Sequence, residues 1–346
     1  MFGKLLLAFA ISFGVAAVFG VWLVPYLKKI KAGQMIKENG PTWHMSKSGT
    51  PTMGGFIFIA GTAAACLTTG LSCMLAGDYS HIIVLFFALA FGAIGFLDDY
   101  EKLRHKQNLG LTAGKKFLLQ CLVAAIFVFL LRCLGMIAPH LYIPFWNITV
   151  QMTPWFYYAF MVFVIVATVN AVNLTDGVDG LATGTSLPVF GFYAFVALAW
   201  YTASAGSAGS ERYLALGIFA AGIFGGLCGF LLYNFNPAKV FMGDTGSLFL
   251  GGAVAGMAIA MDMPLIIITI GILYILEVLS DIIQVGYFKL SHGKRVFRMA
   301  PIHHHLEMGG FTGHKWTEKQ LFALFTGIST AMAIWSYFGV CGRFSA

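Results

Sequence analysis

Long apolar runs recur along almost the entire chain of 346 residues. A helix needs about 20 mainly apolar residues to cross the hydrocarbon core of a bilayer, and ten segments reach or approach that length. The expected spans are residues 4–27, 54–76, 81–97, 116–135, 153–172, 184–203, 213–233, 248–262, 264–288 and 320–340. Only 10% of the residues are charged, whereas a soluble domain has about 25%. The sequence therefore predicts an all-α polytopic membrane protein in which residues 1–346 form a single domain.

The basic residues predict the orientation of these spans. The connections after the odd-numbered spans hold 17 of the 21 Lys and Arg residues. The others are Lys4, Arg132, Arg212 and Arg343. Because cytoplasmic loops are enriched in Lys and Arg, we expect the odd-numbered connections in the cytoplasm and both termini outside. The first run is too long for a signal peptide and lacks a small-residue cleavage site, so we expect it to remain as a span.

The connections are mostly short. One outer connection, Leu141 to Gln151, has β-favouring residues on both sides of Trp146-Asn147 and predicts a small external β-hairpin. The formal net charge of +7 comes from basic residues spread over short loops and not from one patch. We therefore expect the lipid bilayer, and no nucleic acid, as the partner of these charges.

Two adjacent acids, Asp98 and Asp99, follow the third apolar run. Neighbouring side chains on a helix diverge by about 100°, so one carboxylate could bind a metal while the other faces a substrate or a lysine. Lys102 is within reach of either acid if the helix continues. An ordinary charged turn at the membrane exit explains the pair equally well.

Polar motifs occur on the predicted cytoplasmic side in all five connections. They comprise residues 47–55, Asp98-Asp99 with Lys115-Lys116, and residues 173–180, 234–247 and 301–307. Glycines in these motifs would let bound oxygens approach backbone N–H groups closely, and the lysines would add positive charge, as in other anion sites. The motifs predict a phosphate-binding cup, although tight helix packing also explains many of the glycines.

Carboxylates in the same loops predict a metal ion. Asp176, Asp179 and Asp244 offer hard oxygen ligands, and Mg²⁺ is usually held by one or two carboxylates together with waters and substrate phosphates. Turn formation is the alternative explanation for the Asp-Gly pairs.

Histidines and intramembrane acids raise two further questions. His303, His304 and His305 are consecutive, so they cannot all face one ion in a regular helix or strand. We expect substrate contacts there and no zinc site, with a solvated loop as the alternative. Glu277 and Asp281 lie four residues apart inside the ninth span, where ionisable groups are functional candidates. They either border a groove for a lipid or pair with groups of neighbouring spans.

Four motifs, taken in order, closely resemble the phospho-N-acetylmuramoyl-pentapeptide transferase family of the polyprenyl-phosphate N-acetylhexosamine-1-phosphate transferase superfamily. They are Asp98-Asp99-x-x-Lys102, residues 173–182, the Phe-Met-Gly-Asp-x-Gly-Ser stretch within residues 234–247, and residues 299–305. The resemblance extends from Gly40-Pro41 to about Glu307, and the final span matches only in being apolar.

The resemblance implies an activity and a setting. The expected reaction transfers phospho-N-acetylmuramoyl-pentapeptide from UDP-N-acetylmuramoyl-pentapeptide to undecaprenyl phosphate, giving lipid I and UMP, with Mg²⁺ as cofactor. The implied location is the bacterial inner membrane, with the active site on its cytoplasmic face. A homodimer is a further expectation from the resemblance alone.

The resemblance also implies roles for individual residues. Asp244 is the expected metal ligand, and Asp98 and Asp99 are expected to act with it in catalysis. Phe241 resembles the aromatic residue near the uracil. The expected substrate contacts are Lys47, Thr52, Lys115, Asn173, Asp176, Asp179, Asn234, Phe241, His303, His304 and His305.

Phosphate chemistry limits the mechanism. A phosphate monoester has its second pKa near ~6, so the lipid phosphate is a competent nucleophile at neutral pH without a strong general base. We expect direct in-line attack on the β-phosphate of the UDP-sugar. The reaction should be reversible because one phosphoanhydride replaces another. An aspartyl-phosphate intermediate on Asp98 or Asp99 is the alternative.

Three other functions fit parts of the pattern. A related transferase of another amino-sugar phosphate would share the acidic motifs and the spans. A secondary transporter would also have many spans, but transporters usually bind near the midplane and often contain inverted repeats. A structural scaffold would have no use for clustered acids beside phosphate-favouring helix ends.

Overall fold

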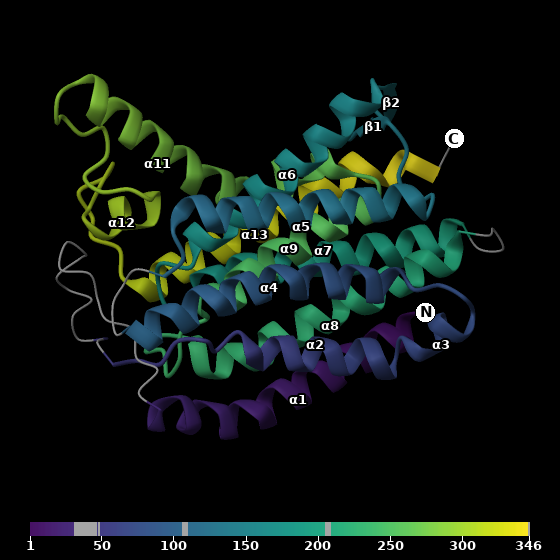
Figure 1. Cartoon of the computed structure of the whole chain (residues 1–346), viewed down its shortest axis with the longest axis horizontal. Coiled ribbons are helices and arrows are strands. Elements are labelled where there is room, and N and C mark those ends of the chain that lie inside the picture. Colours follow the sequence, from purple (N-terminus) through teal and green to yellow (C-terminus); the bar gives the residue numbers. More distant parts are fainter. Residues whose placement is uncertain (31–46, 48, 106–109, 205–208, 345–346) are drawn as a thin grey trace.

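The computed structural model describes residues 1–30, 47, 49–105, 110–204 and 209–344, and these form a mainly helical bundle (Figure 1). Gly40-Pro41, Ser48 and the loop lysines Lys31, Lys37 and Lys106, which entered the arguments above, lie outside the described residues. The elements are α1 (Phe2–Lys29), α2 (Phe56–Thr68), α3 (Leu71–Leu75), α4 (Ser80–His105), α5 (Ala113–Cys133), β1 (His140–Ile143), β2 (Ile148–Gln151), α6 (Pro154–Thr175), α7 (Leu181–Ala203), α8 (Ser210–Asn234), α9 (Gly243–Ala260), η2 (Pro264–Ile266), α10 (Ile267–Ile270), α11 (Ile272–Leu290), α12 (Ile302–Glu307), α13 (Glu318–Val340) and η3 (Cys341–Phe344).

Most of the expected membrane spans are present. Within the described residues, eight helical segments are long and apolar enough to cross a bilayer. A ninth is counted if the segment Pro264–Ile270 is joined to α11, which is bent from it by 81°. The remaining expected span is α9, whose 18 residues extend about 27 Å, slightly less than the ~30 Å hydrocarbon core. The protein is therefore a multi-pass membrane protein with eight or nine supported spans, and the expected number of ten stays a prediction.

Helix α9 is the centre of the bundle. Its residues from Thr245 to Ala260 are all buried, and α4 and α6 pack along it. Small residues permit this packing: a Cβ atom added at Gly251 would meet the backbone of Val169 at 2.6 Å. Gly and Ala at such positions let transmembrane helices approach closely. Because no side of α9 faces lipid, its short apolar length is tolerated.

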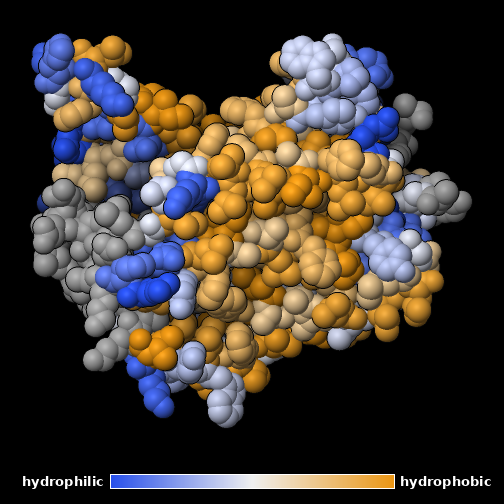
Figure 2. Space-filling view, viewed as in Figure 1, coloured by the Kyte–Doolittle hydropathy of each residue, from blue (hydrophilic) through white to orange (hydrophobic). Residues whose placement is uncertain are grey.

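The two ends of the bundle differ. Figure 1 shows both chain termini and the β-hairpin at one end and α12 at the opposite end. The hairpin pairs β1 and β2 antiparallel, with Leu141 opposite Val150, which confirms the expected hairpin. On the face shown in Figure 2, hydrophobic residues cover the middle of the molecule and hydrophilic residues gather towards both ends, as expected for a bilayer protein. Which end faces the cytoplasm stays a prediction.

Candidate active site

A close helix crossing brings the acidic residues together. A Cβ atom added at Gly95 of α4 would overlap the carbonyl group of Asp244, the second residue of α9. Asp98 and Asp99 follow Gly95 by one helical turn, so the crossing places both beside the start of α9. A glycine is required there because any side chain would separate the two helices.

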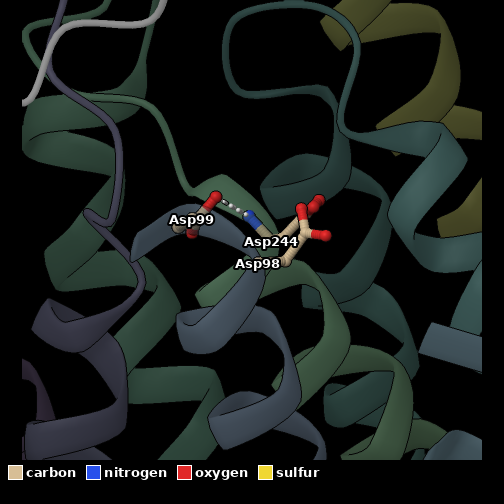
Figure 3. A group of neighbouring side chains, drawn as sticks. All are labelled: Asp98, Asp99 and Asp244. Carbon is tan, nitrogen blue, oxygen red and sulfur yellow. Dashed lines mark hydrogen bonds between the residues drawn. The ribbon is translucent and has the colours of Figure 1, made fainter. Parts of the chain in front are cut away.

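Three carboxylates and two lysines form the cluster that results. Each of Asp98, Asp99 and Asp244 offers one carboxylate oxygen, and these three atoms lie within 4.8 Å of one another (Figure 3). Lys102 Nζ lies 2.6 Å from Asp98 Oδ2 and 2.7 Å from Asp244 Oδ2. Lys116 Nζ lies 3.0 Å from the same Asp244 oxygen. Three ionised carboxylates beside two ammonium groups leave an excess of negative charge, which favours binding of a further cation.

The paired aspartates have different surroundings. Both oxygens of Asp99 accept hydrogen bonds from α9: Oδ2 from the N–H and hydroxyl of Thr245, at 2.9 and 2.7 Å, and Oδ1 from the Asp244 N–H at 3.2 Å. These bonds satisfy N–H groups of the first helical turn, as a capping residue does. Asp98 instead accepts one backbone bond, from Leu111 N–H at 2.9 Å. In Figure 3 the carboxylate of Asp99 lies apart from the adjacent carboxylates of Asp98 and Asp244, and one of its oxygens accepts the hydrogen bond from the Asp244 N–H.

Several residues expected to bind substrate surround this cluster. Asn173 Nδ2 donates to Asp244 Oδ1 at 2.7 Å and to Ser247 Oγ at 2.7 Å. Thr52 borders Asp99, because a Cβ atom at Gly243 would lie 2.5 Å from Thr52 Oγ1 and 2.7 Å from Asp99 Oδ2. The structure thus brings Thr52 and Asn173 to the three aspartates.

Phe241 is held by its backbone. Its N–H donates to the Pro51 carbonyl at 2.8 Å, and its carbonyl accepts from Gly54 N–H at 2.8 Å. The residue is half-buried. Pro51 and Gly54, within the motif at residues 47–55, are therefore held against the segment that precedes α9.

Asp176 lies in the turn after α6. Burial and the negative charges of Asp244, Asp99 and Asp179 raise the pKa of Asp176 to about 8. A carboxyl group in this setting keeps its proton at neutral pH and can donate a hydrogen bond.

A second charged cluster lies beside the first motif. Lys47 Nζ lies 2.7 Å from Asp179 Oδ1 and 2.6 Å from a carboxylate oxygen of Glu318 at the start of α13. Asn236 Nδ2 donates to Asp179 Oδ2 at 3.1 Å and to Glu318 at 3.0 Å. Asn236 and Glu318 also line a cavity of about 820 Å³ together with Arg298, Glu307, Met308, Lys315, Trp316, Thr317 and Lys319. Glu318 was not singled out from the sequence, and the apolar final span gave no signal for it.

Asn234 is buried and makes two hydrogen bonds within the protein. Its side-chain oxygen accepts from Thr183 Oγ1 at 2.9 Å, and its amide nitrogen donates to the Val240 carbonyl at 3.1 Å. The residue is 2% exposed. These contacts hold the turn after α8 in place, and the expected substrate contact stays a prediction.

The neighbouring lysines at the start of α5 point to different places. Lys116 reaches Asp244, whereas Lys115 is exposed. Lys102 also contacts Asp244, 142 positions away. The resemblance gave neither Lys102 nor Lys116 a role in the site. The sequence had nevertheless placed Lys116 in the phosphate-binding cup and Lys102 within reach of the paired acids.

The three histidines of α12 have separate partners. His303 Nδ1 lies 3.0 Å from Glu277 Oε2, and His304 Nδ1 lies 2.6 Å from Glu307 Oε2. His305 Nδ1 accepts from the Arg298 N–H at 3.0 Å. Among the described residues, the group of acids and histidines that could hold a metal ion is Asp98, Asp99 and Asp244. The expectation of no zinc site at the histidines stays a prediction.

Comparison with known proteins identifies the family. Residues 81–262 match the family model described as glycosyl transferase family 4. A phospho-N-acetylmuramoyl-pentapeptide-transferase of Listeria monocytogenes serotype 4b (strain CLIP80459) is 45% identical over 329 residues, covering 94% of this chain and 95% of the relative. Proteins with the same name from Caldanaerobacter subterraneus subsp. tengcongensis and Clostridium acetobutylicum are 44% and 43% identical, covering 91% and 96% of this chain and 93% and 98% of the relatives. With this identity over nearly its whole length, the chain belongs to the phospho-N-acetylmuramoyl-pentapeptide-transferase family, within glycosyl transferase family 4.

Proposed function

We propose that this protein transfers phospho-N-acetylmuramoyl-pentapeptide from its UDP carrier to undecaprenyl phosphate, giving lipid I and UMP in peptidoglycan synthesis. The observation that carries the proposal is the cluster of Asp98, Asp99 and Asp244 with two lysines at a loop end of the bundle. Such a cluster suits charge neutralisation in phosphoryl transfer. The names of the relatives supply the identity of the transferred group.

The donor set fits Mg²⁺. All the clustered ligands are carboxylate oxygens, which Mg²⁺ prefers, and it commonly uses one or two carboxylates with substrate phosphates and waters. Asp99 is already committed to the start of α9, so we assign the metal to Asp98 and Asp244. Bound there, Mg²⁺ would neutralise negative charge on the diphosphate of the substrate.

The chain's own residues would then orient the reactants. Lys102 and Lys116 would place positive charge beside the diphosphate, and Asn173 would hold the carboxylate of Asp244 in position. An oxygen of the lipid phosphate would form a bond to the β-phosphorus of the UDP-sugar. The bond from that phosphorus to the bridging oxygen would break, and UMP would leave with the electron pair. The alternative is a covalent route on Asp98 or Asp99, and Asp98 is favoured because the carboxylate of Asp99 already accepts three hydrogen bonds from α9.

The membrane location, the orientation and the oligomeric state are also proposals. The relatives are bacterial proteins, and the polar motifs lie at the end of the bundle opposite the termini. We assign the protein to the bacterial inner membrane with this end in the cytoplasm. A homodimer is proposed from the resemblance alone, and its test is the mass of the purified protein in detergent.

The test is release of UMP by purified protein given UDP-N-acetylmuramoyl-pentapeptide, undecaprenyl phosphate and Mg²⁺. We expect release that requires the lipid phosphate and stops when EDTA removes the metal. Other UDP-amino sugars serve as matched controls, since faster transfer from one of them would favour the related transferase. Folded protein that releases no nucleotide from any of these donors would refute the transferase proposal.

A further inference from the structure

A buried acid and a buried histidine face each other at the bend of the ninth span. Glu277 lies in α11, just after the 81° bend, and is 0% exposed. His303 of α12 is 1% exposed, and its Nδ1 lies 3.0 Å from Glu277 Oε2. This contact settles the partner of Glu277, which the sequence left open.

Each member of the pair has one polar atom without a hydrogen-bond partner among the described residues. Glu277 Oε1 and His303 Nε2 are both buried, and neither has a hydrogen-bond partner within the described part of the chain. Buried polar groups are normally satisfied, so an exception calls for an explanation. The open nitrogen of His303 therefore favours a ligand there over a purely structural role.

The geometry fixes the direction of the open histidine nitrogen. His303 Nδ1 faces Glu277, so Nε2 is the ring nitrogen left for another partner. Nε2 lies against Gly177, where an added Cβ atom would overlap it. Gly177 directly follows Asp176, whose carboxyl group is within electrostatic range of Asp244 and Asp99. The open nitrogen thus lies on the turn that borders the three aspartates.

We propose that Glu277 is a positioning residue that holds His303 so that Nε2 hydrogen-bonds a phosphate oxygen of the nucleotide-sugar substrate. The proposal rests on the transferase function proposed above. In the bound state the ring carries a hydrogen on each nitrogen, donating one to Glu277 and the other to the substrate. Glu277 itself touches no substrate and acts through His303, as the outer partners of ligating histidines do.

The experiment measures steady-state UMP release by Glu277→Gln, His303→Ala and the double variant. Glu277→Gln keeps the size of the side chain and loses its charge. We expect kcat/KM for the nucleotide sugar to fall about 10- to 100-fold, the range seen when the outer partner of a ligating histidine is lost. The loss should arise mainly through KM, and the KM for undecaprenyl phosphate should not change. The double variant should lose no more than His303→Ala alone, because the two residues act as one unit.

Gly177→Ala provides an independent test that leaves Glu277 intact. Gly177 is exposed in a turn, so the protein should fold, but the new methyl group would displace His303 Nε2. We expect a loss in kcat/KM similar to that of Glu277→Gln, and no further loss when the substitution is added to His303→Ala. Asp281→Asn, on the same helix, is the matched control for removing a charge from α11 and should change kcat/KM less than about threefold.

The outcomes separate this proposal from the function on which it rests. If the wild-type protein releases no UMP, the transferase function fails first. If the wild type is active and folded Glu277→Gln and Gly177→Ala keep its kcat/KM, only the positioning role is overturned. Multiplicative losses in the double variants, or a loss confined to kcat, would also overturn it, because a structural role lowers the active fraction without changing substrate affinity.

Discussion

The two ends of α9 each carry an aspartate in a charged cluster, and the two clusters have opposite characters. At the start of the helix, Asp244 meets Lys102 and Lys116, but two more carboxylates lie beside it. Just after the end of the helix, Asp262 meets Arg343 at 2.6 Å and His140 at 2.9 Å. No other acid of the described chain joins that second ion-pair group.

The contacts of the Asp262 cluster connect three segments of the chain. Arg343 donates to the backbone carbonyls of Met261 and Asp262, at 3.2 and 2.7 Å. Its guanidinium carbon lies 4.5 Å from the centre of the Tyr142 ring and 5.0 Å from that of Trp200. The planar guanidinium can use its donors and its faces at the same time. The Asp262 cluster thus joins the hairpin, the turn after α9 and the C-terminal segment.

The difference lies in charge balance. At the Asp262 end one carboxylate is matched by one guanidinium, so the described groups there carry no excess of negative charge. At the Asp244 end the carboxylates outnumber the ammonium groups, which is unfavourable for the protein alone and favourable for a bound cation. Excess charge of one sign thus identifies the candidate active site, whereas the presence of buried charge does not.

The same substitution at both ends of α9 tests this comparison most strongly. Asp244→Asn should lower UMP release about 1000-fold or more, because it removes a charge on which binding of the metal and the diphosphate depends. Asp262→Asn should keep the activity but destabilise the protein by about 1–3 kcal/mol through its weakened bonds to Arg343. Activity and thermal unfolding in detergent are measured on both variants. Equal effects on activity would abolish the distinction between the two ends.

Within the Asp244 cluster, substitution of Asp98 should mainly affect activity, and substitution of Asp99 should mainly affect stability. Asp98→Asn should lower kcat about 100- to 1000-fold with little change in thermal stability. Asp99→Asn should lower the unfolding temperature, since its carboxylate accepts three hydrogen bonds from α9. Thr245→Val is the matched control, because it removes one of these donors and should cost about 1 kcal/mol. If Asp99→Asn melts like the wild type, the assignment of Asp99 to helix capping is wrong.

The lysine pair at the start of α5 gives a smaller contrast. Lys116→Met removes an ammonium group that contacts Asp244 and should lower kcat/KM about 10- to 100-fold. Lys115→Met removes an exposed charge and should change it less than about threefold. The two variants are compared by measuring kcat/KM at varied concentrations of the UDP-sugar. A larger effect at Lys115 would restore the residue expected from the sequence and count against the geometry of Lys116.

The smallest expected effect is a pH dependence of stability due to Asp176. Its pKa is about 8 in the folded protein and near 3.9 in an unfolded chain, so the folded state binds more protons between these values. The contribution of Asp176 to stability should therefore fall as the pH rises from about 4 to about 8, and level off above. Asp176→Asn lacks this component, so its unfolding temperature relative to the wild type should rise by a few degrees between pH 5 and pH 8. Parallel curves for the two proteins would contradict the raised pKa.

Much of the architecture could be predicted from local sequence. The apolar runs correspond to helices, and the hairpin expected at Leu141 to Gln151 forms between His140 and Gln151. Asp98, Asp99 and Asp244, the acids to which the resemblance gave catalytic roles, lie together in the structure. Their roles stay a prediction. The ninth expected span differs, because the chain bends by 81° around Gly271, and an apolar run carries no information about such a bend.

The amino-acid sequence by itself determined that the chain crosses a membrane several times and which polar loops connect the helices. Each span must satisfy its own backbone within the lipid and is therefore recognisable in a local stretch. Tertiary structure alone decided which polar groups meet. The crossing at Gly95 turns Asp98 towards Asp244 and Asp99 into the start of α9. Packing of α12 against α11 joins His303 to Glu277. These contacts depend on the rotation and crossing of helices far apart in sequence, and the hydropathy of the individual segments does not encode them.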